Sequence, residues 1–242
     1  MFFNAGGGEN MRLNQFISSS GYCSRRRADK LIKDKKVTVN GSLIKLGAMI
    51  SDGDLVEVDG QPIKAKENNI YLMLNKPPGI TCTAASHIEG NIIEYVNYPE
   101  RIFPVGRLDK QSEGLILLTD DGSIVNNLLQ EESNQEKDYI VTVNRVITIM
   151  FMESMASGVE IYNPRKKENI KTKQCKVVQI DGNNFKITLS QGLNRQIRRM
   201  CRRFQYTVTK LQRVRIKHLS LGELELGQWR HLSEEEIEGL KE

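Results

Sequence analysis

The sequence predicts an α+β protein in two parts, in which a small unit of two helices and a small sheet precedes a larger domain with a mixed, largely antiparallel sheet. Apolar residues recur at helical spacing over residues 13–17 and again over residues 28–32. From Ile70 onward, short apolar runs are separated by only occasional helical segments. This second pattern is typical of antiparallel or mixed sheets, because parallel sheets need a helix after almost every strand.

The chain of 242 residues divides into four predicted segments. Residues 1–10 include three consecutive glycines and little that could pack, so we expect a flexible tail and regard Met11 as a candidate natural start. Residues 11–60 form the first unit. The polar segment 61–69, which contains Pro62, is expected to be a linker, and residues 70–242 form the larger domain.

The first unit should contain two helices followed by short strands. The run 18–21 ends the first helix, and Ser24 is a suitable N-cap for the second. Asn40-Gly41 between two apolar pairs predicts a hairpin, and residues 55–58 supply a further strand.

Basic residues gather between Arg12 and Lys36, where eight cations face only two acids, whereas the net charge of the whole chain is +5. A solvated helix face is the usual explanation of such a run, and a surface for nucleic-acid phosphates is the alternative.

The larger domain opens with the apolar strand 71–74 and the turn N-K-P-P-G. Further strands are expected over residues 101–105, 115–118 and 136–143, and later segments should add a helix over 123–130, a hairpin over 175–189, an arginine-rich helix near 195–201, and a strand over 213–217 with one basic face. On a wheel of the arginine-rich helix, Arg195, Arg199 and Arg202 form a basic face that we expect to be solvated or to face RNA. Arg198 falls at the border between this face and the apolar one.

Residues 106–115 read G-R-L-D-K-Q-S-E-G-L and place Asp109 on a short loop between two apolar runs. An aspartate beside lysine and serine in a turn is commonly a local cap or a surface ion pair. A catalytic carboxylate is the alternative reading of the same loop.

Four separate motifs between Met11 and Leu240 resemble those of the pseudouridine synthases that modify ribosomal RNA. N-K-P-P-G resembles the start of the family's catalytic domain, and the loop at Asp109 resembles its active-site loop. The motif R-L-N-Q-F-I, followed by C-S-R-R-R-A-D-K-L-I and V-T-V-N-G, resembles the RNA-binding domain first seen in ribosomal protein S4. The resemblance thus implies an S4-like domain followed by a synthase domain.

The resemblance also implies roles for individual residues. Asp109 would be the nucleophile, Arg198 its ionic partner, and Tyr139 the ring that lies against the flipped uracil, although an aromatic residue at the start of a strand more commonly serves packing. RNA contacts are expected from basic residues in both parts of the chain, namely Arg12, Arg25, Arg26, Arg27, Lys30, Arg107, Arg195 and Arg199.

The reaction explains these residue types. Breaking the bond from ribose to uracil nitrogen and rejoining the sugar through carbon 5 needs a carboxylate that stays ionised in a partly dry cleft, and an adjacent guanidinium favours that form. Addition to the ring, attack at the anomeric carbon and glycal formation are all compatible with the sequence. We expect no cofactor, because the base never leaves the pocket and no net oxidation occurs. A metal site is not expected either, since four scattered cysteines and three histidines lack metal-ligand spacing.

No apolar run approaches a membrane span and no signal peptide is evident, so we expect a cytoplasmic protein, without a membrane partner, that acts as a monomer on RNA. The motifs Q-G-L-N-R-Q-I-R-R-M-C and L-G-Q-W-R-H-L-S-E-E-E are most similar to a large-subunit member of the group, which implies a 23S rRNA target near the peptidyl-transferase centre. The sequence departs from the family's pattern at two points. Gln205 stands where a glycine would cap the helix, and the basic tail that some members carry is not present in this sequence.

Other functions are open at this stage. The same reaction at another rRNA or tRNA site is one, and a noncatalytic RNA-binding assembly factor is a second, which an intact Asp109 disfavours. A glycoside hydrolase would need two framing carboxylates, and Glu113 is the only near neighbour.

Overall fold

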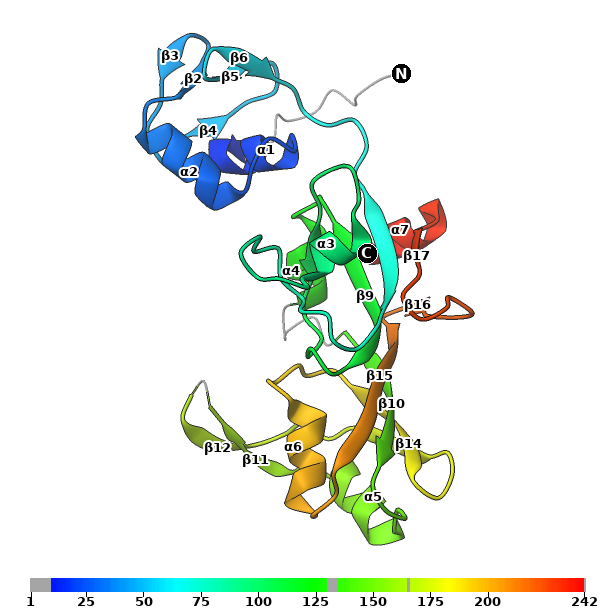
Figure 1. Ribbon diagram of the computed structural model, residues 1–242. Helices are drawn as coiled ribbons and strands as arrows, with labels where there is room; N and C mark the ends of the chain where they lie inside the picture. The colour runs from blue at the N-terminus through cyan, green and yellow to red at the C-terminus, as the bar shows by residue number, and fades with distance from the viewer. Residues whose placement is uncertain (1–9, 130–134, 165, 242) are drawn as a thin grey trace. The chain divides into compact units, whose positions relative to one another are not determined.

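The computed structural model describes residues 10–129, 135–164 and 166–241, and the chain separates into two compact units, residues 1–69 and residues 70–242 (Figure 1). Each unit is described by itself. The tail predicted over residues 1–10 lies, except for Asn10, outside the described residues.

The first unit packs two helices against short strands around a core that includes Leu13, Ile17 and Leu31. Ser24 caps the second helix, since its Oγ accepts a hydrogen bond from the backbone N–H of Arg27 (3.3 Å). The elements are α1 (Leu13–Ser19), α2 (Arg25–Lys33), a sheet in the order β3 (Ser42–Leu43), β2 (Val37–Val39), β5 (Val56–Val58), β6 (Gln61–Ile63), and the separate pair β1 (Met11–Arg12) and β4 (Met49–Ile50).

One boundary differs from the sequence prediction. Gln61–Ile63, which we expected to belong to the linker, form β6 and pair with β5 in antiparallel register. Pro62 is tolerated there because β6 is an edge strand, where a missing N–H breaks no ladder. The sheet of the first unit therefore continues past Gly60.

The second unit is built on a nine-stranded sheet. Among the described strand pairs of this sheet, β9 with β15 is parallel and the others are antiparallel, which confirms the predicted mixed, largely antiparallel sheet. The main order is β13 (Lys176–Gln179), β14 (Asn184–Leu189), β10 (Lys137–Val143), β15 (Val208–Ile216), β9 (Glu113–Thr119), β7 (Tyr71–Lys76), β17 (Trp229–His231), with β16 (Leu219–Ser220) on β15 and β8 (Phe103–Val105) on β9.

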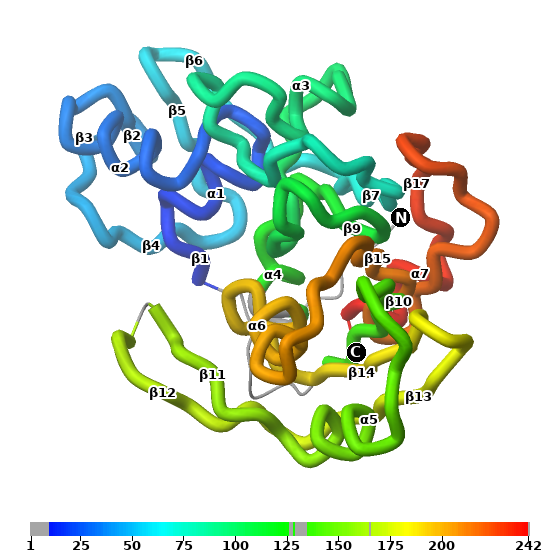
Figure 2. Tube along the Cα trace, turned by 60° about the horizontal axis from the view of Figure 1, so that its bottom comes forward, coloured from blue at the N-terminus to red at the C-terminus, as the bar shows by residue number. Residues whose placement is uncertain are grey.

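Helices and a small hairpin complete this unit. They are α3 (Ile92–Val96), α4 (Ile124–Leu129), α5 (Ile149–Ala156), α6 (Gln196–Arg203), α7 (Glu234–Lys241) and the pair β11 (Glu160–Asn163) and β12 (Glu168–Lys171). The hairpin of β11 and β12, which the sequence did not predict, lies beside α6 (Figure 2). No helix in the described ranges combines the length and apolar character needed to cross a membrane.

Gly114 permits the parallel junction of β9 and β15. It pairs with Arg213 and has a φ of 104°, and a Cβ placed on it would lie 2.2 Å from the carbonyl oxygen of Arg213. A side chain at this position would force the two strands apart. Gly114, near the end of the Asp109 motif, therefore allows β9, the strand that follows the loop, to pair with β15.

A β-bulge corrects the prediction of one basic face on residues 213–217. Tyr139 pairs with Arg213 while its neighbour Asp138 pairs with Arg215, so Val214 is the extra residue. Because Asp138 and Tyr139 point to opposite faces of β10, Arg213 and Arg215 do so as well. Arg215 binds Asp138 (2.8 Å) on the face away from Tyr139 and holds the pKa of that carboxyl well below its usual value.

The helix α6 ends without a glycine. Gln205 adopts the left-handed conformation itself, with a φ of 61°. Its N–H donates to the carbonyl of Arg202 (2.9 Å) and the N–H of Tyr206 donates to that of Cys201 (3.0 Å), which is a Schellman motif. Arg145 also donates to the Gln205 carbonyl (2.5 Å), so a cation caps the helix.

Candidate active site

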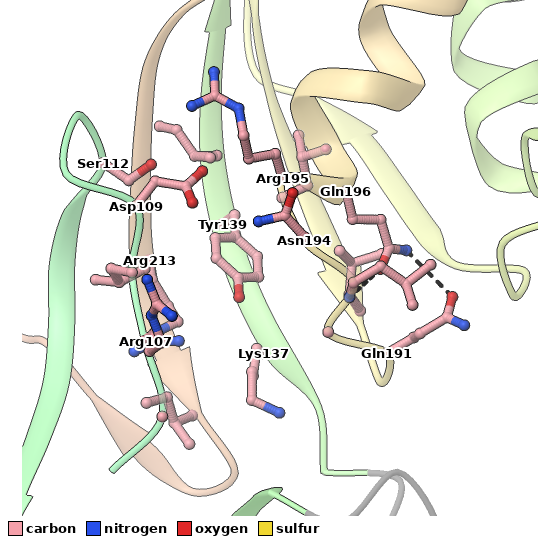
Figure 3. A pocket seen from close by; sticks show the side chains of 18 of the residues that line it. Arg107, Asp109, Ser112, Lys137, Tyr139, Gln191, Asn194, Arg195, Gln196 and Arg213 are labelled. Carbon is pink, nitrogen blue, oxygen red and sulfur yellow. Dashed lines mark hydrogen bonds between the residues drawn. The ribbon is translucent and has the colours of Figure 1, made fainter. Parts of the chain in front are cut away.

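A pocket of about 480 Å³ opens on one face of the sheet in the second unit. Its walls come from the loop after β8, from β10 and β15, and from the segment that precedes α6. Figure 3 shows the carboxylate of Asp109 and the ring of Tyr139 facing the same hollow, with Arg107 and Arg213 beside them. Of the three residues predicted to be catalytic, Asp109 and Tyr139 thus line this pocket.

The loop that carries Asp109 is held by the N-K-P-P-G turn. The Nζ of Lys76 donates to the carbonyls of Pro77 (2.8 Å) and Ile80 (3.1 Å) and lies 3.5 Å from that of Lys110, to which the N–H of Gly79 also donates (2.7 Å). Lys76 is fully buried, and burial lowers its pKa, although Cys82 and Asp109 act against that shift. The turn therefore holds the backbone of Lys110, the residue next to Asp109, in place.

Arg198 lies beside Asp109, as the helical wheel and the resemblance led us to expect. Its Nε is 3.9 Å from the Oδ2 of Asp109, and the two side chains are 15% and 28% exposed. Its Nη atoms donate to the carbonyl of Val208 (3.1 Å) and to the Oγ of Ser112 (3.3 Å), so the guanidinium plane is fixed. Burial and the nearby Arg195 lower the pKa of Arg198, and Asp109 opposes this change.

Tyr139 belongs to both the pocket and the core. It lines the pocket and is partly buried against two apolar clusters of the unit. Its cross-strand partner on β15 is Arg213. Packing holds one side of the ring, and the pocket leaves room on the other.

The three arginines of this unit that were expected to contact RNA divide into two groups. Arg107 and Arg195 are exposed and line the pocket, and Arg195 has a left-handed φ of 51° at the start of α6. Arg199 differs from its predicted place on a free face, since it donates hydrogen bonds to the carbonyl of Tyr162 and to the Oδ1 of Asn194. It joins α6 to β11, because the unpredicted hairpin covers that side of the helix.

Two pocket residues had no predicted role. Arg213 is 4% exposed and its Nε donates to the carbonyl of Leu115 (2.7 Å). Lys137 lies on the pocket wall, and its pKa is lowered to about 8, mainly by burial and also by Arg213. The sequence places Lys137 two residues before Tyr139, which puts both side chains on one face of a strand. Only the pairing of β10 with β15 shows that Arg213 lies beside them.

The basic residues of the first unit are on its surface. Arg12, Arg25, Arg26, Arg27 and Lys30 are all exposed, and none of them forms an ion pair with a described residue. Unpaired exposed cations are available to a polyanion.

The fold and the pocket together define a class of protein. Residues 70–203 match the family model of RNA pseudouridylate synthase, and residues 11–56 match the S4 domain. The chain belongs to the RNA pseudouridine synthase family, in the group that carries an amino-terminal S4 domain.

Individual relatives agree with this assignment. The chain is 45% identical to the dual-specificity RNA pseudouridine synthase RluF of Escherichia coli K12, over 94% of this chain and 77% of the relative. It is 32% identical to the ribosomal large subunit pseudouridine synthase B of Bacillus subtilis, over 95% of each chain. A crystal structure of a pseudouridylate synthase superposes with a TM-score of 0.68 and 32% identity, covering 95% of this chain and 99% of that one.

The protein is therefore an isomerase that converts uridine in RNA to pseudouridine. Its S4 domain is an RNA-binding domain, as the sequence predicted. Among the described residues, no group of three or more histidine, cysteine or acidic side chains is arranged to hold a metal ion.

Proposed function

We propose that this enzyme modifies a specific uridine of 23S rRNA near the peptidyl-transferase centre. Similarity to RluF and to a synthase named for the large ribosomal subunit supports this target. The word dual-specificity in the name of the RluF relatives supports a second candidate, in which the same pocket also accepts a uridine of another RNA, such as a tRNA.

Asp109 is proposed as the nucleophile. The observation that carries this role is the position of its carboxylate, which faces the pocket and lies 3.9 Å from the Nε of Arg198. The guanidinium favours the ionised carboxylate and orients it, and a carboxylate in a partly dry pocket is a competent nucleophile or base.

Tyr139 is proposed to hold the flipped base. Its ring is fixed by the core on one side, so a uracil that enters the pocket can stack on the other without an ordering cost for the tyrosine. Arg107 and Arg195 line the pocket, are exposed and are suited to the phosphates of the strand that carries the target. Arg199 is a weaker candidate because two of its nitrogens already donate to Tyr162 and Asn194.

The S4 domain is proposed to supply affinity rather than chemistry. Arg12, Arg25, Arg26, Arg27 and Lys30 offer exposed charges to phosphates, a contact that carries little sequence information. We further propose that the enzyme acts as a monomer in the cytoplasm. Light scattering of the purified protein tests the first of these two statements, and fluorescence imaging of a tagged protein tests the second.

Chemical mapping of pseudouridine in cells that lack the protein tests the target. We expect one or a few sites in 23S rRNA to lose their signal and to regain it with the wild-type chain but not with Asp109→Asn. Loss of signal only in tRNA, or in small-subunit rRNA, would contradict the 23S rRNA proposal.

A further inference from the structure

A second cluster of charge lies in the pocket beside Tyr139. The guanidinium of Arg213 is deeply buried, yet only its Nε is explained by the fold, through the hydrogen bond to Leu115. Its Nη2 is buried and has no hydrogen-bond partner. Leaving a charged donor buried and unsatisfied is costly, so a ligand group that completes it is to be expected.

Lys137 lies on the same wall of the pocket. It precedes Tyr139 by two residues on β10, and this spacing puts both side chains on one face of the strand. Its Nζ donates to the carbonyl of Gln135 (3.2 Å). Figure 3 shows Lys137, Tyr139 and Arg213 around the same hollow.

No carboxylate of the described residues balances these two cations. Neither Lys137 nor Arg213 forms an ion pair there, while Asp109 already has Arg198 as its partner. Arg213 also lowers the pKa of Lys137, which is the effect of one cation near another. Two like charges on one partly buried wall are stabilised best by an anion between them.

A purely structural role explains less of this arrangement. The hydrogen bond to Leu115 ties β15 to β9 and accounts for one donor of Arg213. It does not account for the buried Nη2 or for the placement of Lys137 within the pocket.

We propose that Lys137 and Arg213 form a phosphate subsite that binds a backbone phosphate adjacent to the target uridine. The inference rests on the proposed role of this pocket as the nucleotide site. A base on Tyr139 and a phosphate on the two cations would hold the ribose between them, in the pocket that Asp109 also lines. Lys137 and Arg213 are thus positioning residues.

Binding of mononucleotides to the full-length protein tests the subsite without turnover. Dissociation constants of uridine, uridine 3′-monophosphate, uridine 5′-monophosphate and inorganic phosphate are measured by NMR titration at one ionic strength. The proteins are the wild type, Lys137→Met, Arg213→Lys and, as a control, Lys176→Met, which removes an exposed lysine on β13. The amide spectrum of each variant reports whether it is folded.

At least one monophosphate should bind the wild type about tenfold more tightly than uridine, the size expected of charge-assisted hydrogen bonds. That preference should fall below about twofold in Lys137→Met and weaken in Arg213→Lys, and it should persist in Lys176→Met. Methionine keeps most of the lysine stem, so Lys137→Met remains informative if Arg213→Lys does not fold.

Any of three results would overturn the proposal. The first two are equal affinity of the wild type for uridine and for both monophosphates, and an unchanged preference in Lys137→Met. Inorganic phosphate that binds as tightly as the nucleotides and ignores Lys137→Met would also overturn it, because the anion would then bind elsewhere. Pseudouridine formation in RNA is assayed separately, so failure of the proposed target and failure of the subsite give different results.

Discussion

The Nε of Arg198 points toward Oδ2 of Asp109 across 3.9 Å, and it is buried without a hydrogen-bond partner. The Nη atoms of this guanidinium donate to the carbonyls of Val208 and Gln111 and to the Oγ of Ser112. The separation is too long for a hydrogen bond, but a small movement of the carboxylate would form one. Catalytic contacts of this kind commonly tighten when substrate binds, so the pair can gain strength along the reaction.

Asp109→Asn should abolish isomerisation. The amide has nearly the same shape as the carboxylate but is neither a nucleophile nor a base, so the single-turnover rate should fall by at least about 10⁴-fold. RNA affinity, measured by filter binding, should stay within about twofold, because the basic surfaces are intact. A variant that forms pseudouridine at the wild-type rate would remove Asp109 from the mechanism.

Arg198→Ala should lower the single-turnover rate by about 10²- to 10³-fold with little change in RNA affinity, because Asp109 loses its charge partner and its orientation. Arg199→Ala is the matched control on the same helix. It should keep the rate at saturating enzyme but lower the free energy of unfolding by about 1–3 kcal/mol, since the hydrogen bonds from α6 to Tyr162 and Asn194 can no longer form. Equal rate losses in the two variants would show that Arg198 is not the charge partner on which Asp109 depends.

Neutralising the basic surface of the S4 domain should change affinity and its salt dependence. Replacing Arg25, Arg26, Arg27 and Lys30 by glutamine should reduce the slope of log affinity against log salt by about 0.7–0.9 for each phosphate that the variant no longer neutralises. The rate at saturating enzyme should not change. Four exposed lysines of the second unit, Lys166, Lys167, Lys171 and Lys176, provide a charge-matched control that should alter the slope less. An equal slope in the wild type and the S4 variant would identify that helix face as merely solvated.

Gln205→Gly should stabilise the protein by about 0.5–1 kcal/mol. A residue with a side chain is strained at the φ of 61° that ends α6, and glycine is not. The melting temperature should rise accordingly. Gln179→Gly in β13, where no left-handed conformation is required, should instead lower it. A loss of stability in Gln205→Gly would mean that interactions of the glutamine side chain outweigh the backbone strain.

Glu236→Gln should destabilise the protein at neutral pH but not in acid. Two hydrogen bonds from Arg230 (2.7 and 2.6 Å) lower the pKa of Glu236 from 4.5 to about 2. Because the folded pKa is below the unfolded one, this stabilisation is complete above pH 4.5 and is lost as the pH falls toward 2. Urea unfolding should therefore show a deficit of about 1 kcal/mol at pH 7 that vanishes near pH 2. The exposed neighbour variant Glu235→Gln should show neither effect.

Local sequence patterns predicted most of the elements. Ser24 caps α2 as expected, and Asn40 and Gly41 form the hairpin turn with φ values of 51° and 75°. These features depend on a few neighbouring residues, so they can be predicted from the chain alone. The loop of Asp109 was also located by its local pattern, a polar motif between two apolar runs, and its resemblance to the family's active-site loop implied the catalytic role.

Relationships between distant segments were decided by the tertiary structure. Arg213 and Arg215 alternate like residues on one strand face, yet pairing with β10 inserts a bulge at Val214 and sends them to opposite faces. Arg199 was predicted to be free because a helical wheel cannot represent a hairpin packed against the helix. The sequence alone therefore determined the class of enzyme, the order of its two domains and the identity of the loop that faces the pocket. Strand register and packing decided the role of each cation: whether it lines the pocket, forms an ion pair or holds a helix in place. The sequence alone could not decide this, because register and packing bring together residues that are far apart in the chain.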